Sequence, residues 1–353
     1  MKILVIKFRN IGDVLLTTPL IRNLKFNYPD AKIDFALNEG TDAILKYNPY
    51  INKTFVYKRK YIKSLSFFRK IREEINYIKN IAVKKYDLVI NLTRGDRGSI
   101  ISLLSGKIKI GYPSSKNLLL KNIYDLEIPG YGNRHIVDAT LDVIRLLNLK
   151  IYDKKVEIFW NDFDKEYVKS ILPNKRFIHI HPVSRWLFKC VDDKIMAKII
   201  DFIKSKNFEV VITASNDKKE KEKVRNILNL CKSKPINLSG KLTLNQVAYL
   251  ASKAHFFVGV DTAVMHIAAA VNTPVVAFFG PSAVFNWGPW DNDLFESGYK
   301  RRNGIQKMGK HVVIQHDWNC IPCIKDGCNG SKISECLMNF DMEKVFKIIE
   351  EKM

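Results

Sequence analysis

Residues 258–270 read VGVDTAVMHIAAA, which begins as an apolar run and becomes rich in small residues after Asp261. The first part is typical of a buried strand and the second of a helix that starts at once, with Asp261 or Thr262 as its N-cap. Since the first turn of a helix presents free N–H groups and the positive end of the helix dipole, the segment predicts an anion site suited to a diphosphate. His266, one turn further along, can donate to the same anion. A capped helix with a packed histidine is the alternative, because plain caps share this chemistry.

Strands and helices alternate on both sides of this segment, in the order expected of doubly wound α/β domains. The sequence predicts strands over residues 2–7, 32–37, 86–92, 176–182, 209–213, 255–260 and 273–279, and helices over residues 14–26, 195–204, 218–231 and 243–252. Residues 153–173 are polar and show no clear long element. We therefore expect an α/β fold with two Rossmann-like domains, residues 1–165 and 166–353, and a site in the cleft between them. For the last helix, packing against the first domain is an alternative to packing within the second.

The length suits two folded domains, and the charge is strongly positive. The chain has 353 residues, 46% of them hydrophobic, so each half can bury a core. A formal net charge of +22 attracts polyanions such as nucleic acid, anionic lipid headgroups or a phosphorylated glycolipid, although a lysine-rich compositional bias gives the same total. The basic residues are spread over the chain and match no nucleic-acid-binding signature, so nucleic acid is not the expected partner.

Residues 53–85 hold eleven Lys or Arg and two acidic residues, with aromatic side chains interleaved. Ile71, Ile75, Ile78 and Ala82 recur at three- and four-residue steps, which predicts an amphipathic helix. The segment is either a core helix with a solvated basic face or a surface that meets an anionic membrane or acceptor.

The N-terminus does not read as a secretory signal, because Lys7, Arg9 and Asp13 follow a short apolar run that ends at Ile6. The longest later apolar stretch, residues 267–279, is far short of the roughly 18 residues of a membrane span. We expect a cytoplasmic protein, peripheral on the cytoplasmic face of the inner membrane.

Four of the six cysteines, Cys320, Cys323, Cys328 and Cys336, gather near the C-terminus. In the cytosol such a group is not a disulfide framework by default. The spacing permits a zinc site but matches no common zinc module, and a buried cluster of reduced thiols is the alternative.

Three motifs, taken together, resemble one enzyme family. Residues 258–270, followed by Phe279-Gly280-Pro281-Ser282, resemble the ADP-heptose:lipopolysaccharide heptosyltransferases. Residues 12–19, GDVLLTTP, and residues 181–189, HPVSRWLFK, look like that family's other signatures. The Ser-Arg-Trp-x-Phe-Lys form and the cysteine run look most like the heptosyltransferase III branch. The match covers nearly the whole chain, apart from residues 53–85 and 150–175.

The resemblance implies a GT-B type fold and transfer of heptose from ADP-L-glycero-D-manno-heptose to the lipopolysaccharide inner core. It implies inversion at the anomeric carbon without an obligatory metal or cofactor, with the acceptor on the N-terminal domain and the nucleotide sugar on the C-terminal domain. Asp13 is then the general base, a role that suits a carboxylate on a loop past a strand end. Gly12 allows the tight turn there. The alternative for Asp13 is an N-cap of the following helix.

The resemblance also indicates donor contacts. Lys189 is expected to neutralise charge on the leaving ADP, and Ser184 and Arg185 to contact phosphate. Either Asp217 or Glu220 is expected on the ribose, while Leu242 falls where the family cradles adenine. The predicted donor-binding residues are Ser184, Arg185, Lys189, Asp217, Glu220, Leu242, Asp261, Thr262, Ala263 and His266. Surface charge is the alternative for Asp217 and Glu220, and core packing for Leu242.

Arg94 and Arg97 follow the strand predicted over residues 86–92, where loops beyond strand ends build ligand sites. A guanidinium binds carboxylate or phosphate through two hydrogen bonds, and the lipopolysaccharide inner core carries both groups, so both arginines are acceptor candidates. A surface Arg–Asp pair is the alternative. Two other functions stay open at this point: a GT-B enzyme that uses another nucleotide sugar, and a basic nucleic-acid-binding protein.

Overall fold

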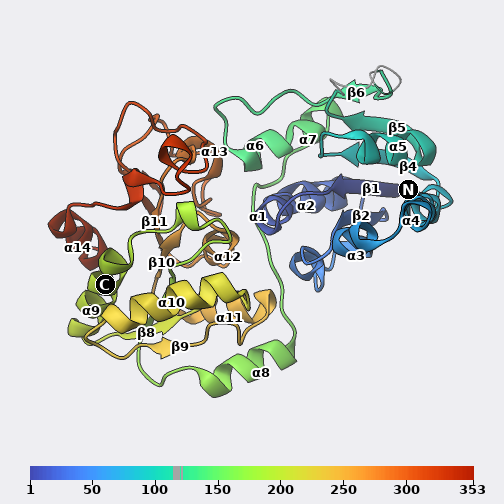
Figure 1. Ribbon diagram of the computed structural model, residues 1–353. Coiled ribbons are helices and arrows are strands. Elements are labelled where there is room, and N and C mark those ends of the chain that lie inside the picture. Colours follow the sequence, from blue (N-terminus) through green and yellow to red (C-terminus); the bar gives the residue numbers. More distant parts are fainter. Residues whose placement is uncertain (114–119, 121) are drawn as a thin grey trace. The chain divides into compact units, whose positions relative to one another are not determined.

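The computed structural model describes residues 1–113, 120 and 122–353, and the chain divides into two compact units. The N-terminal unit consists of residues 1–132 and 136–156, and the C-terminal unit of residues 133–135 and 157–353. Each unit is built around its own sheet with helices packed against it (Figure 1).

The described strands of the N-terminal unit form a parallel sheet in the order β3-β2-β1-β4-β5-β6. The strands are β1 (Lys2–Lys7), β2 (Lys32–Asn38), β3 (Ile51–Tyr57), β4 (Tyr86–Asn91), β5 (Gly106–Gly111) and β6 (Leu126–Glu127). The helices are α1 (Ile11–Leu15), α2 (Thr18–Asn27), η1 (Asp42–Leu45), α3 (Arg59–Ser64), α4 (Phe67–Ala82), α5 (Asp96–Ser105), α6 (Ile136–Thr140) and α7 (Asp142–Leu146). Residues 3–6 of β1 are fully buried, because helices cover both faces of a parallel sheet.

The helix predicted over residues 14–26 is wrong as a single element, since the structure breaks it into α1 and α2. Pro19 lies in the first turn of α2, where its missing N–H costs nothing, but it disfavours a continuous helix through the residues before it. Two threonine hydroxyls donate hydrogen bonds to backbone carbonyl groups at the break. Thr17 Oγ1 donates to Asp13 O and Thr18 Oγ1 donates to Leu15 O, both at 2.8 Å.

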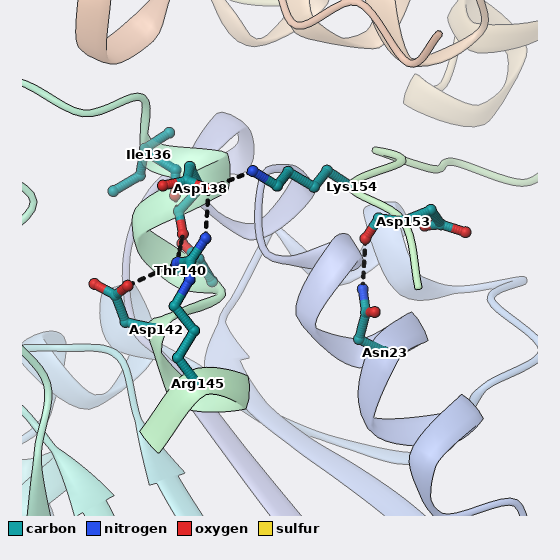
Figure 2. A network of polar contacts seen from close by, with 8 residues as sticks. All are labelled: Asn23, Ile136, Asp138, Thr140, Asp142, Arg145, Asp153 and Lys154. Carbon is teal, nitrogen blue, oxygen red and sulfur yellow. Dashed lines mark hydrogen bonds and ion pairs between the residues drawn. The ribbon is translucent and has the colours of Figure 1, made fainter. Parts of the chain in front are cut away.

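The segment that follows α7 is bonded to the N-terminal unit (Figure 2). Lys154, which is buried, pairs with Asp138 at 2.5 Å, and Arg145 pairs with the same carboxylate at 2.7 Å. Burial raises the pKa of Asp138, but the two cations hold it below its usual range. Asn23 Nδ2 donates to Asp153 O at 2.8 Å. These contacts explain why the first unit extends to Val156.

The C-terminal unit holds a sheet in the order β12-β13-β11-β10-β7-β8-β9, parallel in its described part except for β12. The strands are β7 (Phe177–His181), β8 (Glu209–Ile212), β9 (Ile236–Asn237), β10 (Phe257–Val260), β11 (Val275–Phe278), β12 (Gln306–Met308) and β13 (His311–Ile314). The helices are α8 (Asp162–Ile171), η3 (Leu187–Lys189), α9 (Asp193–Ser205), α10 (Lys218–Leu230), α11 (Leu244–Lys253), α12 (Ala263–Ala270), α13 (Val284–Trp287), η4 (Cys328–Gly330), η5 (Glu335–Leu337) and α14 (Met342–Glu350).

The strands predicted in both halves are confirmed to within two residues at each end, but residues 153–173 were misjudged. They contain α8, which Asn161 caps by accepting from Asp164 N–H at 2.9 Å and which buries Val168. Charged residues make up half of α8, so the segment reads as polar, although Val168 and Ile171 are three residues apart and pack in one cluster. The last helix, α14, belongs to the C-terminal unit, where Phe346 stacks on Phe202 of α9 with ring centroids 4.2 Å apart.

The basic segment predicted as an amphipathic helix forms the end of β3 and then α3 and α4. Only Ile81 of α4 is buried, whereas Ile71 and Ile75 are exposed. Tyr77 and Ile78 pack against a core cluster with Ile81, so the core-helix alternative holds for the C-terminal part of α4, while Ile71 and Ile75 stay open to solvent. Nowhere in residues 1–113, 120 and 122–353 is there a helix with both the length and the apolar character needed to span a membrane.

Candidate active site

The predicted anion site lies where β10 passes into α12. Thr262 is the N-cap residue in an extended conformation, and within the described residues its side chain makes no capping hydrogen bond. The Asp261 side chain also bonds elsewhere, so capping by either side chain is not what the structure shows. Met265 N–H donates to Thr262 O at 3.1 Å, while neither side chain caps the N–H groups of Ala263 and Val264. The positive end of the helix dipole favours an anion there.

Three side chains from three different strand ends meet at Asp261. Lys189 Nζ lies 2.6 Å from Asp261 Oδ2, and Ser282 Oγ donates to the same oxygen at 2.5 Å. Lys189 follows β7, Asp261 follows β10 and Ser282 follows β11, and these strands are neighbours in the sheet. After β7 the chain adds β8 and β9 on one side of the sheet, and then β10 and β11 on the other side. Ligands of open α/β sheets bind at the carboxyl ends of the two strands between which the order reverses, here β7 and β10.

The Asp261 carboxylate is charged in this setting. Burial raises its pKa, but the Lys189 ammonium, the Ser282 hydroxyl and His266 together hold the pKa below its usual range. His266 is buried one turn into α12, close enough to take part in this electrostatic balance. The arrangement therefore holds a cation, a hydroxyl and a helix N-terminus around one buried carboxylate.

The loop after β7 is held in a compact form. The buried Ser184 donates its N–H to Cys190 Sγ at 3.2 Å, and its hydroxyl accepts from Trp186 N–H at 3.3 Å. Burial raises the pKa of the Cys190 thiol to about 11, so that sulfur is a neutral packing group. Arg185 is exposed and lies over the Trp186 ring, with its Cζ 5.6 Å from the centroid. The loop thus fixes Ser184 and leaves Arg185 accessible.

The ribose and adenine candidates lie beyond β8. Asp217 caps α10 by accepting from Lys219 N–H and Glu220 N–H. Glu220 is buried and accepts from Ser215 N–H at 3.0 Å, so the surface-charge alternative is wrong for Glu220. Leu242 is partly buried against a cluster that includes Tyr249. The structure does not bring these residues into contact with Asp261.

Asp13 lies in the first turn of α1 in the N-terminal unit. The helix N-cap is Asn10, and its N–H donates to Asp13 Oδ2 at 3.3 Å, so Asp13 supports the cap without being the N-cap. Lys7, at the end of β1, is buried beside it. Burial lowers the pKa of Lys7, and the Asp13 carboxylate partly offsets that effect. Sequence reasoning missed Lys7, because a lysine at a strand end gives no local sign of burial.

The two arginines after β4 have different surroundings. Arg97 forms an ion pair with Glu74 at 2.8 Å and donates to the Tyr57 hydroxyl at 2.6 Å. Tyr57 also donates to Glu74, and burial together with that bond raises its pKa to about 12. The alternative for Arg97 was a surface Arg–Asp pair, and the structure instead shows an Arg–Glu pair that joins α4 to α5. Arg94 is exposed and lies over the Tyr112 ring at 5.3 Å.

The cysteine group near the C-terminus is reduced. All six thiols of the chain are free. Burial raises the pKa of Cys336 to about 12, and the nearby thiols of Cys328, Cys323 and Cys320 add to the effect. In the part of the chain that the structure describes, no group of three or more His, Cys, Asp or Glu residues is arranged to hold a metal ion.

Comparison with known proteins agrees with these features. Residues 75–312 match the family model described as glycosyltransferase family 9 (heptosyltransferase). Lipopolysaccharide heptosyltransferase 3 of Escherichia coli is 34% identical over 293 residues, which are 81% of this chain and 85% of that protein.

Two solved structures share the fold. A family 9 glycosyl transferase from Veillonella parvula superposes with a TM-score of 0.80 at 22% identity, covering 99% of this chain and 96% of that one. The E. coli heptosyltransferase WaaC with ADP gives a TM-score of 0.74 at 17% identity, with both chains fully covered at 100%. These likenesses confirm the predicted fold class, α/β with two doubly wound Rossmann-like domains of the GT-B type.

Proposed function

Because this chain belongs to glycosyltransferase family 9, the heptosyltransferase family, we propose that it transfers heptose from ADP-L-glycero-D-manno-heptose to the lipopolysaccharide inner core. The observation that carries the proposal is the Lys189–Asp261–Ser282 cluster at the N-terminus of α12, in a chain 34% identical to a lipopolysaccharide heptosyltransferase. The C-terminal unit binds the nucleotide sugar, and the N-terminal unit binds the acceptor. Transfer inverts the anomeric carbon and needs no metal.

In the donor complex, the diphosphate accepts from the first-turn N–H groups of α12. Lys189 turns from Asp261 to the phosphates and neutralises the charge that builds on the leaving ADP. Asp261 is then a positioning residue, since it holds the ammonium and the Ser282 hydroxyl at the site. The phosphates are also contacted by Ser184, Arg185, Thr262, Ala263 and His266. The ribose and adenine are contacted by Asp217, Glu220 and Leu242.

We propose Asp13 as the general base. An acceptor hydroxyl attacks well only when its proton is removed as it attacks, and a positioned carboxylate does this. Asp13 lies in the first turn of α1, just past the end of β1, and the buried Lys7 ends that strand. Arg94 is proposed as the contact to an anionic group of the acceptor, because Arg97 already engages Glu74.

We also propose that the enzyme works in the cytoplasm, attached peripherally to the inner membrane through α4. Phe67, Phe68, Ile71 and Ile75 of this helix are 70%, 83%, 41% and 57% exposed. Phe68, Ile71 and Ile75 share a face because they are three and four residues apart, and Arg72 and Lys79 flank them. Apolar side chains with flanking cations match an anionic lipid surface.

The test of the transfer reaction uses purified protein, ADP-heptose and a core acceptor that lacks one heptose. A gain of one heptose in the mass of the acceptor is the expected result. Titration with ADP, UDP and GDP tests the donor: tighter binding of UDP or GDP than of ADP would replace ADP-heptose by another nucleotide sugar.

A further inference from the structure

A pocket of ≈ 450 Å³ opens in the C-terminal unit, outside the Asp261 cluster. Its lining contains three consecutive cations, Lys300, Arg301 and Arg302, together with Phe285, Tyr299 and Pro322. No carboxylate is among its lining residues. The lining therefore combines a concentrated positive charge with aromatic and apolar faces, which suits an anionic ligand that carries a ring.

The three cations lack acidic partners within the described residues. Arg301 donates to Ile305 O, and Arg302 Nη2 donates to Asn319 O at 3.0 Å, so both guanidinium groups touch backbone carbonyls. Neighbouring lysines differ, since Lys310 pairs with Asp293 at 2.6 Å and Lys307 with Glu351 at 3.4 Å. The pocket thus keeps charge that an external anion can neutralise.

The walls of the pocket are fixed by specific hydrogen bonds. Asn303 Nδ2 donates to Trp318 O at 2.9 Å and to Ile321 O at 3.0 Å, which holds the turn after Arg302 against the segment that carries Pro322. Tyr299 is buried and donates to Pro289 O at 2.8 Å. Its ring packs so tightly on Gly288 that a methyl group there would overlap it. The pocket is therefore largely preformed, as ligand sites usually are.

The pocket is joined to the donor site through one short segment. Ser282, which donates to Asp261, lies in the loop just before α13, and Phe285 is the second residue of that helix. Gln315 Nε2 donates to both Gly280 O and Ser282 O, at 2.7 and 2.9 Å, and holds that segment in place. The pocket shares this segment with the donor site, but none of its lining residues is among those assigned to the donor.

We propose that this pocket binds an anionic sugar of the lipopolysaccharide acceptor through its phosphate or carboxylate group. The inference rests on the proposed heptose transfer and adds a recognition site for the acceptor in the C-terminal unit. Lys300 and Arg302 hold the anion, and Phe285, which is only partly buried, contacts the sugar ring. The enzyme would then select acceptors by their charge as well as by the attacking hydroxyl.

The experiment compares the full-length protein with Lys300→Ala and Arg302→Ala, with Arg302→Lys as the conservative variant. Lys234→Ala is the control, because it removes an exposed lysine of the same unit that does not line the pocket. Equilibrium binding of a core oligosaccharide, the KM values for acceptor and ADP-heptose, and the affinity for ADP are measured. Three acceptors are used: intact, with phosphates removed, and with carboxylates reduced.

Loss of one charge-assisted hydrogen bond is expected to weaken acceptor binding and raise its KM about 10-fold or more, while ADP affinity stays unchanged. Removing the recognised anionic group from the acceptor should weaken its binding to wild type by the same factor. Binding to Arg302→Ala should not change further. The modified acceptor that shows this pattern tells whether the pocket recognises phosphate or carboxylate. Acceptor binding within twofold of wild type in both alanine variants overturns the proposal, and so does an equal loss of ADP affinity, which would assign the pocket to the donor. If wild type transfers no heptose, the proposed function is wrong. The binding measurements still show whether the pocket binds the anionic group of the acceptor.

Discussion

The Lys189 ammonium and the Asp261 carboxylate, 72 residues apart in the chain, lie 2.6 Å from each other at the N-terminus of α12. The pair is mostly buried, with side-chain exposures of 25% and 10%. It places a positive charge beside a helix N-terminus before any donor binds. The electrostatics needed for a leaving diphosphate are thus built in advance.

Replacing Lys189 by Met should weaken ADP binding about 10- to 100-fold, because the phosphates lose a charge-assisted hydrogen bond while the length of the side chain is kept. Calorimetric titration with ADP measures the effect. Lys204→Met is the matched control, since Lys204 pairs with Glu209 at 2.9 Å in the same unit at similar exposure. Unchanged ADP affinity in Lys189→Met would remove Lys189 from the donor site.

Asp261→Asn should lower the free energy of unfolding at neutral pH. In acid the wild type and the variant should differ less, because the Asp261 carboxylate becomes protonated. The folded pKa of Asp261 is lowered, so its contribution is fully present above the unfolded pKa of about 3.9 and is lost as the pH falls through the folded pKa. Urea unfolding of both proteins between about pH 7 and pH 3 gives the difference in free energy. A difference that stays constant over this range contradicts the assigned ionisation.

Asp13→Asn should lower the turnover number by about 10²–10⁴, the usual contribution of a positioned general base, with ADP-heptose binding nearly intact. The amide keeps the size of the side chain and its bond to Asn10 N–H but loses basicity. Asp42→Asn serves as the control, because Asp42 also lies in a first helical turn of the N-terminal unit. Turnover close to wild type in Asp13→Asn would leave Asp13 as support for the helix cap only.

Phe68→Ser combined with Ile71→Ser should reduce sedimentation with anionic vesicles at low salt. Burial of one such apolar side chain is worth roughly 1.5–3 kcal/mol, so the double variant should lose most of the binding. Phe163→Ser is the matched control, since Phe163 is 72% exposed but stands between Asp162 and Asp164. If wild type sediments equally with neutral and anionic vesicles, the proposed attachment of α4 to an anionic membrane is wrong.

Local signals in the sequence predicted much of the fold. The apolar runs at residues 3–6 and 257–260 are strands because each is buried on both faces, a pattern carried by consecutive residues. The break at Thr17 was missed because Pro19 interrupts a helix that the hydrophobic period alone would continue. The helix at residues 162–171 was missed because its many charged residues made the segment read as a polar loop.

By itself, the sequence determined the α/β alternation, the central strands of both sheets, the family motifs and the segment that forms the anion site, since these depend on residues close together in the chain. Only the tertiary structure decided that Ser282 and Lys189 meet at Asp261, that Arg97 is engaged by Glu74, and that a cationic pocket lies beside the loop of Ser282. The physical reason is that sheet order, which brings β7, β10 and β11 together, is set by the packing of the whole unit and leaves no mark on spacing along the chain.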